Sequence, residues 1–536
     1  MQYVLHYLLF FDTTQLLMLQ YLKFNTNHCG SDAFDNDETR RKYSRRVVRY
    51  GQEVDWLEGR HYTVDTLEKY RLIGDHEMDQ ILNLSSGKIS ISGAFSNTVD
   101  ACEKIYHEQK KNGKQMDNLS DEDLAMLKFY EHYHDRIPRW VDFQQIQRGI
   151  DVFITYAPVA GQALFYLSLV PGFSIPKIAK VLEQTRYLVP PSTPEQVRNR
   201  LMDTGGFISN TMLPGNNGFS AASLRPGSKG WKMALQVRVL HAKVRRSILR
   251  NKRISWDTNK YGVPINQEDM AATLLAFSVN VLMGIRFISG RELSLKEQKD
   301  YLALWRYIGW LLGVECDENG IDLAFPSLKT DCNPLPMDPC GTRMYSRNGD
   351  DSVIHARACL ESIILHLMQP DESSSRTAMH LLSIGGSRLE NHASQNSKGT
   401  GDSIMLLYRL YMCRRFIGTP LADALKLPKP NYHLKSILAY TLTTFILVMF
   451  RIYTLLTMSS SWFRNKAYAR HLRLTEGFVK VWSENNSQRM QEKADQDINE
   501  TQSLSSRKNI KKATPCPFSL VMPPTPEKRI THSKIA

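Results

Sequence analysis

The amino-acid sequence predicts a mainly α-helical fold. Between Asp121 and about Cys316 the apolar residues recur at helical spacing almost throughout. Runs that alternate apolar and polar residues, as strands do, are few, and the clearest one, Ile89–Ile91, is short. The chain has 536 residues, of which 42% are hydrophobic, so it is long enough to bury a large core. The mean hydropathy of −0.35 argues against a polytopic membrane protein.

Loops divide the chain into long helical segments. Proline, glycine and serine cluster at residues 190–194, 214–230, 331–351 and 385–403. We assign residues 1–50 to an apolar N-terminal segment with a basic linker, and residues 51–483 to one large helical domain with peripheral helices. Residues 484–536 are rich in Ser, Asn, Gln, Lys and Pro and hold few large apolar side chains, so we expect them to be disordered.

Two helices are expected at the centre of the core. Asn266 precedes Asp269 by three residues, a spacing like that of a helix capping box, and Met270–Ile285 is apolar on nearly every side. The segment Tyr301–Val314 carries a single charge, Arg306, and predicts a second buried helix. Its large aromatic side chains fit either the wall of a pocket or plain core packing.

Two apolar stretches bear on a membrane. Residues 1–24 contain Asp12 and have no basic start, so they make a poor signal peptide and stay a candidate signal anchor. Residues 436–450 are uncharged and are followed by Arg451 and a second apolar run through Phe463. At 1.5 Å per residue the first run covers roughly 22 Å of a ~30 Å hydrocarbon layer. Residues 436–463 are therefore either a membrane-associated segment or a buried core helix.

The net charge of +14 allows nucleic acid, an anionic membrane surface or an anionic cofactor as a partner. Nucleic-acid binding rests only on basic runs such as residues 40–49, without a recognition motif, so we expect no nucleic-acid partner. The sequence holds no phosphate-binding glycine loop, nicotinamide fingerprint, hydrolase elbow or zinc-protease motif. Its eight cysteines are scattered without a C-x-x-C pair, which predicts a reducing compartment.

The most informative segment is residues 231–251, which we expect to form one helix. An apolar stripe along it consists of Met233, Val237, Leu240, Val244 and Ile248. His241 lies at the edge of this stripe, and Arg238 and Arg245 fall on the other flank of the histidine. The pattern suits a planar amphiphilic ligand such as haem b, with the imidazole on the metal and the arginines on the carboxylates. A satisfied core histidine beside a solvated arginine face gives the same pattern.

A second constellation precedes this segment. Arg200 and Thr204 are four residues apart and face the same way on a helix. Together they offer a cation and a hydroxyl that polarise an oxygen-bearing ligand. The alternative is a surface arginine and a threonine packed against its own preceding turn.

At these residues the chain resembles a known family. Six segments match in the family's order: Ile137–Phe153, Arg200–Thr204, Val237–Arg245 (VRVLHAKVR), Pro264–Ser278, Leu304–Val314 and Ile417–Pro428. They resemble the catalytic domain shared by the ER-bound oxygenases of the MpaB type and the rubber oxygenases, also called latex-clearing proteins. The resemblance spans about residues 121–430, and the fungal MpaB-type branch looks closer than the secreted bacterial branch.

The resemblance implies a globin-like helical core within residues 51–483 that holds one b-type haem, with His241 as the proximal axial ligand of the iron. It makes Arg200 and Thr204 candidates for the distal pocket. Asp203 stands where a rubber oxygenase can place a distal lysine ligand, so we expect no lysine on the iron. The general-base carboxylate of the family falls near Glu183.

The resemblance also implies the reaction and its setting. We expect O2-dependent oxidative cleavage of a carbon–carbon double bond in a hydrophobic isoprenoid, polyketide or terpenoid-derived substrate of secondary metabolism. We expect the protein on the endoplasmic reticulum membrane, facing the cytosol. The alternatives are a haem-dependent hydroxylase or oxidase of a secondary metabolite, and a non-catalytic, membrane-associated haem- or ligand-binding protein.

Overall fold

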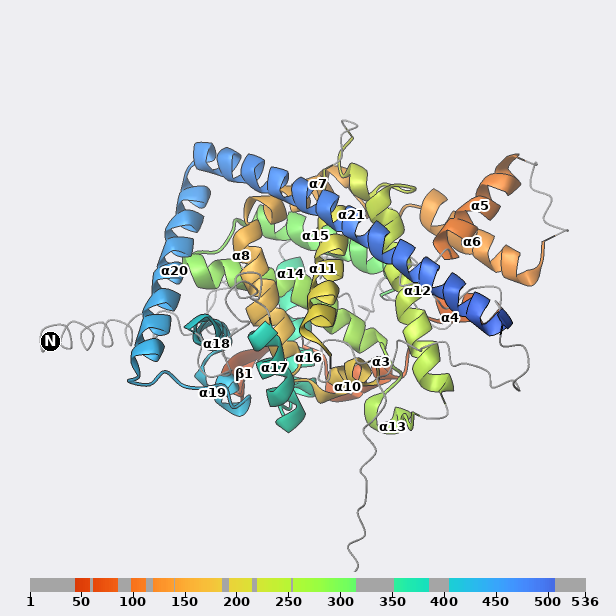
Figure 1. The fold of residues 1–536 in the computed structure, drawn as a ribbon. Helices are drawn as coiled ribbons and strands as arrows, with labels where there is room; N and C mark the ends of the chain where they lie inside the picture. Colours follow the sequence, from red (N-terminus) through yellow and green to blue (C-terminus); the bar gives the residue numbers. More distant parts are fainter. Residues whose placement is uncertain are drawn as a thin grey trace, which may run out of the picture.

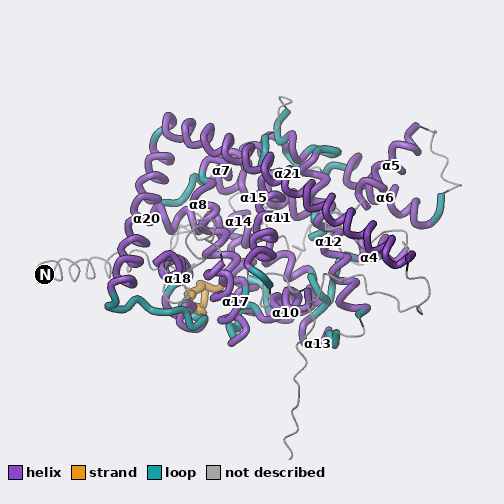
Figure 2. Tube along the Cα trace, in the orientation of Figure 1, coloured by secondary structure: helices purple, strands orange, loops and turns teal. Residues whose placement is uncertain are grey.

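The fold was analysed in a computed structural model, which describes residues 44–57, 61–84, 98–111, 119–138, 140–185, 192–214, 219–251, 254–314, 351–384 and 404–506. Nearly all regular structure in these residues is helical, and their strands form one antiparallel hairpin (Figures 1 and 2). The predicted mainly α-helical fold is therefore confirmed.

A β-hairpin and a first group of helices precede the central part of the chain. These elements are β1 (Ser44–Arg49), β2 (Gln52–Leu57), α3 (Val64–Arg71), α4 (His76–Leu84), α5 (Thr98–Lys111) and α6 (Asp121–Asp135). The next are α7 (Phe143–Thr155), α8 (Ala157–Gln162), the π-helix η3 (Ala163–Leu169), α9 (Val170–Gly172), α10 (Pro176–Thr185) and α11 (Pro194–Thr211).

The second half of the described chain is helical throughout. It contains η4 (Ala222–Leu224), α12 (Lys229–Arg250), α13 (Thr258–Tyr261), α14 (Gln267–Ser289), α15 (Leu295–Leu311) and α16 (Asp351–Leu367). It ends with α17 (Glu372–Ile384), α18 (Ile404–Ile417), α19 (Thr419–Ala424), α20 (Leu434–Ser459) and α21 (Ser461–Ser506).

Helices α14 and α15 lie at the centre of the molecule, as predicted (Figure 1). The Asn266 side chain caps α14 by accepting a hydrogen bond from the Asp269 N–H at 2.9 Å. The rings of Phe277 on α14 and Trp305 on α15 stack with their centroids 5.0 Å apart. The guanidinium of Arg306, the one charge in its segment, lies 4.0 Å from the centroid of the Trp140 ring.

Helix α7 approaches α15 closely because Gly149 has no side chain. A Cβ atom at this position would lie 2.3 Å from the backbone oxygen of Asp300. We therefore predict that Gly149→Ala lowers the free energy of unfolding by about 2 kcal/mol, since the two helices must separate. Denaturant unfolding would measure it. Gly161→Ala on α8, where a Cβ meets no atom within 4 Å, is the matched control, and equal midpoints for the two variants would contradict the prediction.

Three sequence predictions meet the structure at the ends of the chain. Helix α21 continues to Ser506, through residues 484–506 for which disorder was predicted. The contacts of Trp482 and Arg489 with Asp203 on α11 hold this stretch against the domain. Residues 44–57, predicted as part linker, form the β-hairpin. The candidate anchor at residues 1–24 and the tail beyond residue 506 lie outside the described residues.

Helix α20 runs along one edge of the molecule, and α21 starts at the end of α20 and runs across the molecule (Figure 1). Of the described helices, α14 and α20 are long and apolar enough to cross a membrane, with 61% and 17% of their most apolar windows buried. The low burial of α20 means that residues 436–459 do not form a buried core helix. The membrane-associated alternative is the one that stays open.

Candidate functional site

Helix α12 carries the predicted haem-binding residues and is buried on more than one side. Met233 and Ile248 of the predicted stripe are buried, whereas Val237, Leu240 and Val244 are half-buried. Arg238 and Arg245 are also buried, with 0% and 3% of their surface exposed. The solvated arginine face considered from the sequence is therefore not what the fold contains.

Both arginines form ion pairs with carboxylates near the start of α4. Arg238 donates to Asp75 from Nε at 2.6 Å and from Nη2 at 2.8 Å, and Nη2 also lies 2.9 Å from Glu77 Oε2. Arg245 Nη1 donates to Asp79 Oδ1 at 2.8 Å. These guanidinium groups thus have carboxylate partners within the chain. That they bind haem carboxylates stays a prediction. One donor is available for such a bond, because Nη1 of Arg238 is buried and has no partner among the described residues.

The carboxylates on α4 were missed from the sequence. Asp75, Glu77 and Asp79 alternate through the start of a helix, which alone indicates only a favourable helix N-terminus. Their arginine partners lie more than 160 residues away along the chain. The sequence offered two signals for this pairing, namely the alternating carboxylates in one segment and the arginines beside a histidine in another. Only the tertiary structure shows that the carboxylates pair with the arginines.

His241 lies between the two arginines on α12 and holds an unsatisfied nitrogen. Its Nδ1 atom is buried and has no hydrogen-bond partner among the described residues. Burial and the charge of Arg245 together lower the pKa of the imidazole to about 4, against the opposing charge of Asp75. The ring is therefore neutral at physiological pH, the form in which imidazole binds a metal. These properties fit a residue that ligates the iron of a haem.

Helix α11, which carries Arg200 and Thr204, packs directly on α12. A Cβ on Gly230 of α12 would lie 2.7 Å from the Asn210 backbone oxygen of α11. Thr204 donates its hydroxyl to the backbone oxygen of Arg200 at 3.1 Å, within its own preceding turn, and the distal role of the two residues stays a prediction. The Arg200 side chain is half-buried.

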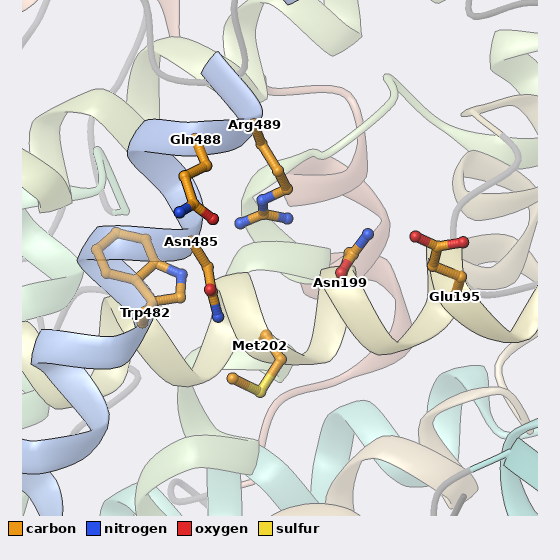
Figure 3. Close-up of a pocket in the computed structure, with 7 residues that line it drawn as sticks. All are labelled: Glu195, Asn199, Met202, Trp482, Asn485, Gln488 and Arg489. Carbon is orange, nitrogen blue, oxygen red and sulfur yellow. The ribbon is translucent and has the colours of Figure 1, made fainter. Parts of the chain in front are cut away.

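Asp203, the residue at the family's lysine position, is bound to α21. Its Oδ1 accepts from Arg489 Nη2 at 2.6 Å and from Trp482 Nε1 at 3.3 Å. Beside these contacts α11 and α21 enclose a cavity of about 220 Å³ (Figure 3), lined by Glu195, Asn199, Met202, Trp482, Asn485, Gln488 and Arg489. This volume is below the roughly 300 Å³ of a site for a drug-sized ligand, and the lining is mostly polar, so the cavity suits water better than an isoprenoid chain.

Glu183, the candidate general base, lies on α10 at its junction with α17. Its Oε2 accepts from Lys180 Nζ at 2.9 Å and its Oε1 accepts from the Ser373 hydroxyl at 2.7 Å. These contacts hold the carboxylate between two peripheral helices. The structure brings His241, Arg238 and Arg245 together on α12 and sets Arg200 and Thr204 on the adjoining helix, while Glu183 is on a third.

A second buried group of charges lies at the start of α14 and was also missed. Arg71 Nη1 lies 3.3 Å from Asp269 Oδ1 and 3.5 Å from Glu268 Oε2, and His366 Nδ1 lies 2.7 Å from Glu268 Oε1. Burial and the neighbouring charge of Glu268 raise the pKa of Asp269 to about 7, although the charge of Arg71 opposes the shift.

Other metal chemistry finds little support. In the described part of the chain no three His, Cys, Asp or Glu side chains are placed to hold a metal ion. Cys102, Cys359 and Cys413 are free and buried. Burial raises the pKa of the Cys102 thiol to about 12, so this cysteine is unreactive at neutral pH.

Comparison with known proteins places the chain in a family. No curated protein and no solved structure matches it. Residues 157–430 match the family model described as "ER-bound oxygenase mpaB/B'/Rubber oxygenase, catalytic domain". The match covers just over half of the chain and includes every candidate site residue, although the similar segment Ile137–Phe153 lies before it. The chain therefore belongs to the family of ER-bound oxygenases of the mpaB type and rubber oxygenases, and residues 157–430 are its oxygenase catalytic domain.

Proposed function

We propose that this protein is a b-type haem-dependent oxygenase whose His241 ligates the iron. The observation that carries the proposal is the imidazole of His241, which is neutral at physiological pH and keeps a buried nitrogen without a partner inside the oxygenase domain. A neutral imidazole nitrogen of this kind is the usual protein ligand of a haem iron. When bound, the haem supplies the site at which O2 is activated.

The reaction that we propose is cleavage of a carbon–carbon double bond in a hydrophobic substrate with an isoprenoid chain. One C=C bond and the O–O bond break, and two C=O bonds form, so one O2 supplies both oxygen atoms and no further reductant is needed. We assign Arg200 and Thr204 to the distal pocket. Arg200 would donate hydrogen bonds to oxygen as negative charge develops on it. Glu183 is the candidate general base.

The proposed location is the endoplasmic reticulum membrane, with the catalytic domain facing the cytosol. Its support is the family description, "ER-bound", together with the exposed apolar helix α20. A membrane location also fits the hydrophobic substrate, because an isoprenoid chain partitions into lipid.

An absorption spectrum of the purified protein tests the cofactor. We expect a Soret band that shifts on reduction with dithionite and again on addition of CO. Incubation with O2 and a farnesyl-bearing compound should then give two carbonyl products. A Soret band with a hydroxylated product would favour a hydroxylase, a Soret band without an O2-dependent product would favour a binding protein, and the absence of a Soret band would refute the proposal.

The role of Arg200 makes a separate prediction. Replacing Arg200 with glutamine removes the cation, so we expect product formation to fall about 100-fold, the loss typical of removing one stabilising donor, at unchanged haem content. Initial rates normalised to Soret absorbance measure this effect. Arg198→Gln is the control, because Arg198 lies on the same half-buried helix two residues away and faces another direction. Equal rates for the two variants would remove Arg200 from the assignment.

A further inference from the structure

Helix α20 has its polarity inverted relative to a helix of a soluble domain. Its buried residues are small or polar, namely Ser436, Ala439, Thr443, Thr454 and Thr457. Its large exposed apolar residues are Leu434, Ile437, Leu438, Phe445, Val448, Met449, Ile452 and Leu456, which we call the α20 stripe. Lys435, Thr441 and Ser459 are also exposed. A surface helix in water buries its large apolar residues and exposes polar ones. A helix in contact with lipid packs small residues against the protein and turns large apolar ones outward.

The polar face of α20 is satisfied by the domain along the whole helix. Near its start, Ser436 Oγ lies 2.6 Å from the hydroxyl of Tyr411 on α18. Near its end, the Tyr453 hydroxyl lies 3.1 Å from Nε2 of His471 on α21, and Nε of Arg464, also on α21, donates to the Thr457 backbone oxygen at 3.4 Å. The domain therefore fixes α20 from end to end, so the stripe is a permanent feature of the surface.

The outward stripe is free of charge. The only charged residue of α20 after Lys435 is Arg451, and its guanidinium is turned to the protein against Gly290, the C-cap of α14. At that position the cation lies at the carboxyl end of a helix, where its charge is favourable. The exposed side chains from Ile437 to Leu456 present hydrocarbon, with 61% of Phe445 and 48% of Met449 accessible, except Thr441, whose hydroxyl donates to the Ile437 backbone oxygen at 2.9 Å.

Both ends of the stripe carry side chains typical of a membrane–water interface. Tyr432 is 99% exposed just before α20, and Trp462 is 57% exposed just after it. Lys435 is exposed near the first, and Lys466 Nζ lies 4.0 Å from the centroid of the Trp462 ring. Tyrosine and tryptophan sit at the headgroup level of bilayers, and lysine pairs there with anionic lipid.

We infer that the α20 stripe inserts into one leaflet of a phospholipid bilayer with the helix axis parallel to the membrane plane. The inference deepens the proposed location at the endoplasmic reticulum membrane, on which it rests, by naming the contacting surface. Spanning would enclose α18 in lipid as well. Arg415 of α18 binds the Tyr440 hydroxyl at 2.8 Å, beside the stripe and inside its length, which suits the headgroup level of a parallel helix and not a hydrocarbon interior.

Lipid fits the stripe better than a second copy of the chain or another protein. The 26 residues of α20 extend about 39 Å at 1.5 Å per residue, and the polar groups beside the stripe along this length are few, among them the Thr441 hydroxyl and the Arg415–Tyr440 pair. Protein interfaces surround an apolar centre with polar groups that pair across the contact. Here the cations and exposed aromatic residues stand at the two ends instead, as an interfacial helix requires.

Vesicle flotation of the full-length protein tests the inference. The vesicles contain phosphatidylcholine with one-fifth phosphatidylserine, and the variant is Phe445→Glu with Met449→Glu. The fraction of protein bound at a fixed lipid concentration gives the membrane partition coefficient. We expect this coefficient to be at least tenfold lower for the variant than for the wild type, because two carboxylates would enter the apolar layer. The control, Val64→Glu with Phe219→Glu, changes residues that are 55% and 64% exposed away from α20, and should bind like the wild type.

Insertion depth separates a parallel helix from a spanning one. An environment-sensitive fluorescent amino acid placed in turn at positions 438, 445 and 456 would be quenched by lipid-borne nitroxides at two depths. One shallow depth at all three positions is expected, and a depth that changes steadily along the helix would overturn the parallel orientation.

Three further outcomes complete the test. Unchanged flotation of the Phe445→Glu, Met449→Glu protein would overturn the inference, provided its melting temperature matches the control. A wild type that is dimeric without lipid and becomes monomeric in this variant would show the stripe to be a self-interface and would also overturn it. Flotation that depends on the stripe in a protein without a Soret band would leave the inference standing and refute the haem proposal alone.

Discussion

The His241→Ala variant is expected to lose its Soret absorbance. His241 is the residue that we assign to the iron, and it is the one histidine of α12. Loss of an outer-shell partner already costs roughly 10–100-fold in metal affinity, and removal of the ligand itself should cost more. Haem content per protein, measured after desalting, quantifies the effect.

Two controls keep this result interpretable. His433→Ala removes an exposed imidazole before α20 and should leave the spectrum unchanged. In His241→Gly, free imidazole added to the buffer should restore part of the Soret band, because it occupies the space of the lost side chain. A His241→Ala protein that keeps the full spectrum would show that another residue ligates the iron, and the assignment of His241 would fall.

The second large effect is expected from the buried ion pair between Asp75 and Arg238. Both groups are almost fully buried, and their two hydrogen bonds join α4 to α12 beside His241. Asp75→Ala would leave the Arg238 guanidinium buried with only Glu77 as an acidic partner. We predict a loss of about 3 kcal/mol in the free energy of unfolding, at the low end of what breaking a buried pair costs. Urea denaturation measures it.

The same pair predicts how stability depends on pH. Burial raises the pKa of the Asp75 carboxyl, but the nearby charge of Arg238, the hydrogen bonds that Arg238 donates and the charge of Arg245 outweigh it, so the pKa lies below its usual value. Asp75 therefore contributes stability above pH ~3.9, its unfolded pKa, and this contribution is lost as the pH falls through the lower folded value. The wild type should lose stability on acidification in this range, and Asp75→Ala should lose less.

A surface pair provides the control for both measurements. Lys104 and Glu108 on α5 lie 3.8 Å apart and are mostly exposed. Glu108→Gln should change the free energy of unfolding by less than ~0.5 kcal/mol, because solvent screens such a pair. If Asp75→Ala destabilised no more than Glu108→Gln, the pair would be no structural link between α4 and α12.

The sequence predicted the helices and the family because both depend on local patterns. The segments Met270–Ile285 and Tyr301–Val314 are apolar on nearly every side, so they are stable mainly when buried, and α14 and α15 are buried. The part of α21 from residue 484 to Ser506 shows the converse, because local composition alone led us to expect disorder there. Its local composition holds few apolar residues, yet the distant Asp203 on α11 binds Arg489 and Trp482 and holds the helix.

What the sequence by itself determined is the set of groups that α12 offers: one histidine between two arginines beside an apolar stripe. Only the tertiary structure decided what those groups meet. It brings the carboxylates of Asp75 and Asp79 to the two arginines and leaves the Nδ1 of His241 without a partner. It also turns Arg451 inward and the apolar side of α20 outward. The reason is physical: helical spacing follows from neighbouring residues, whereas burial and charge pairing depend on segments far apart in the chain.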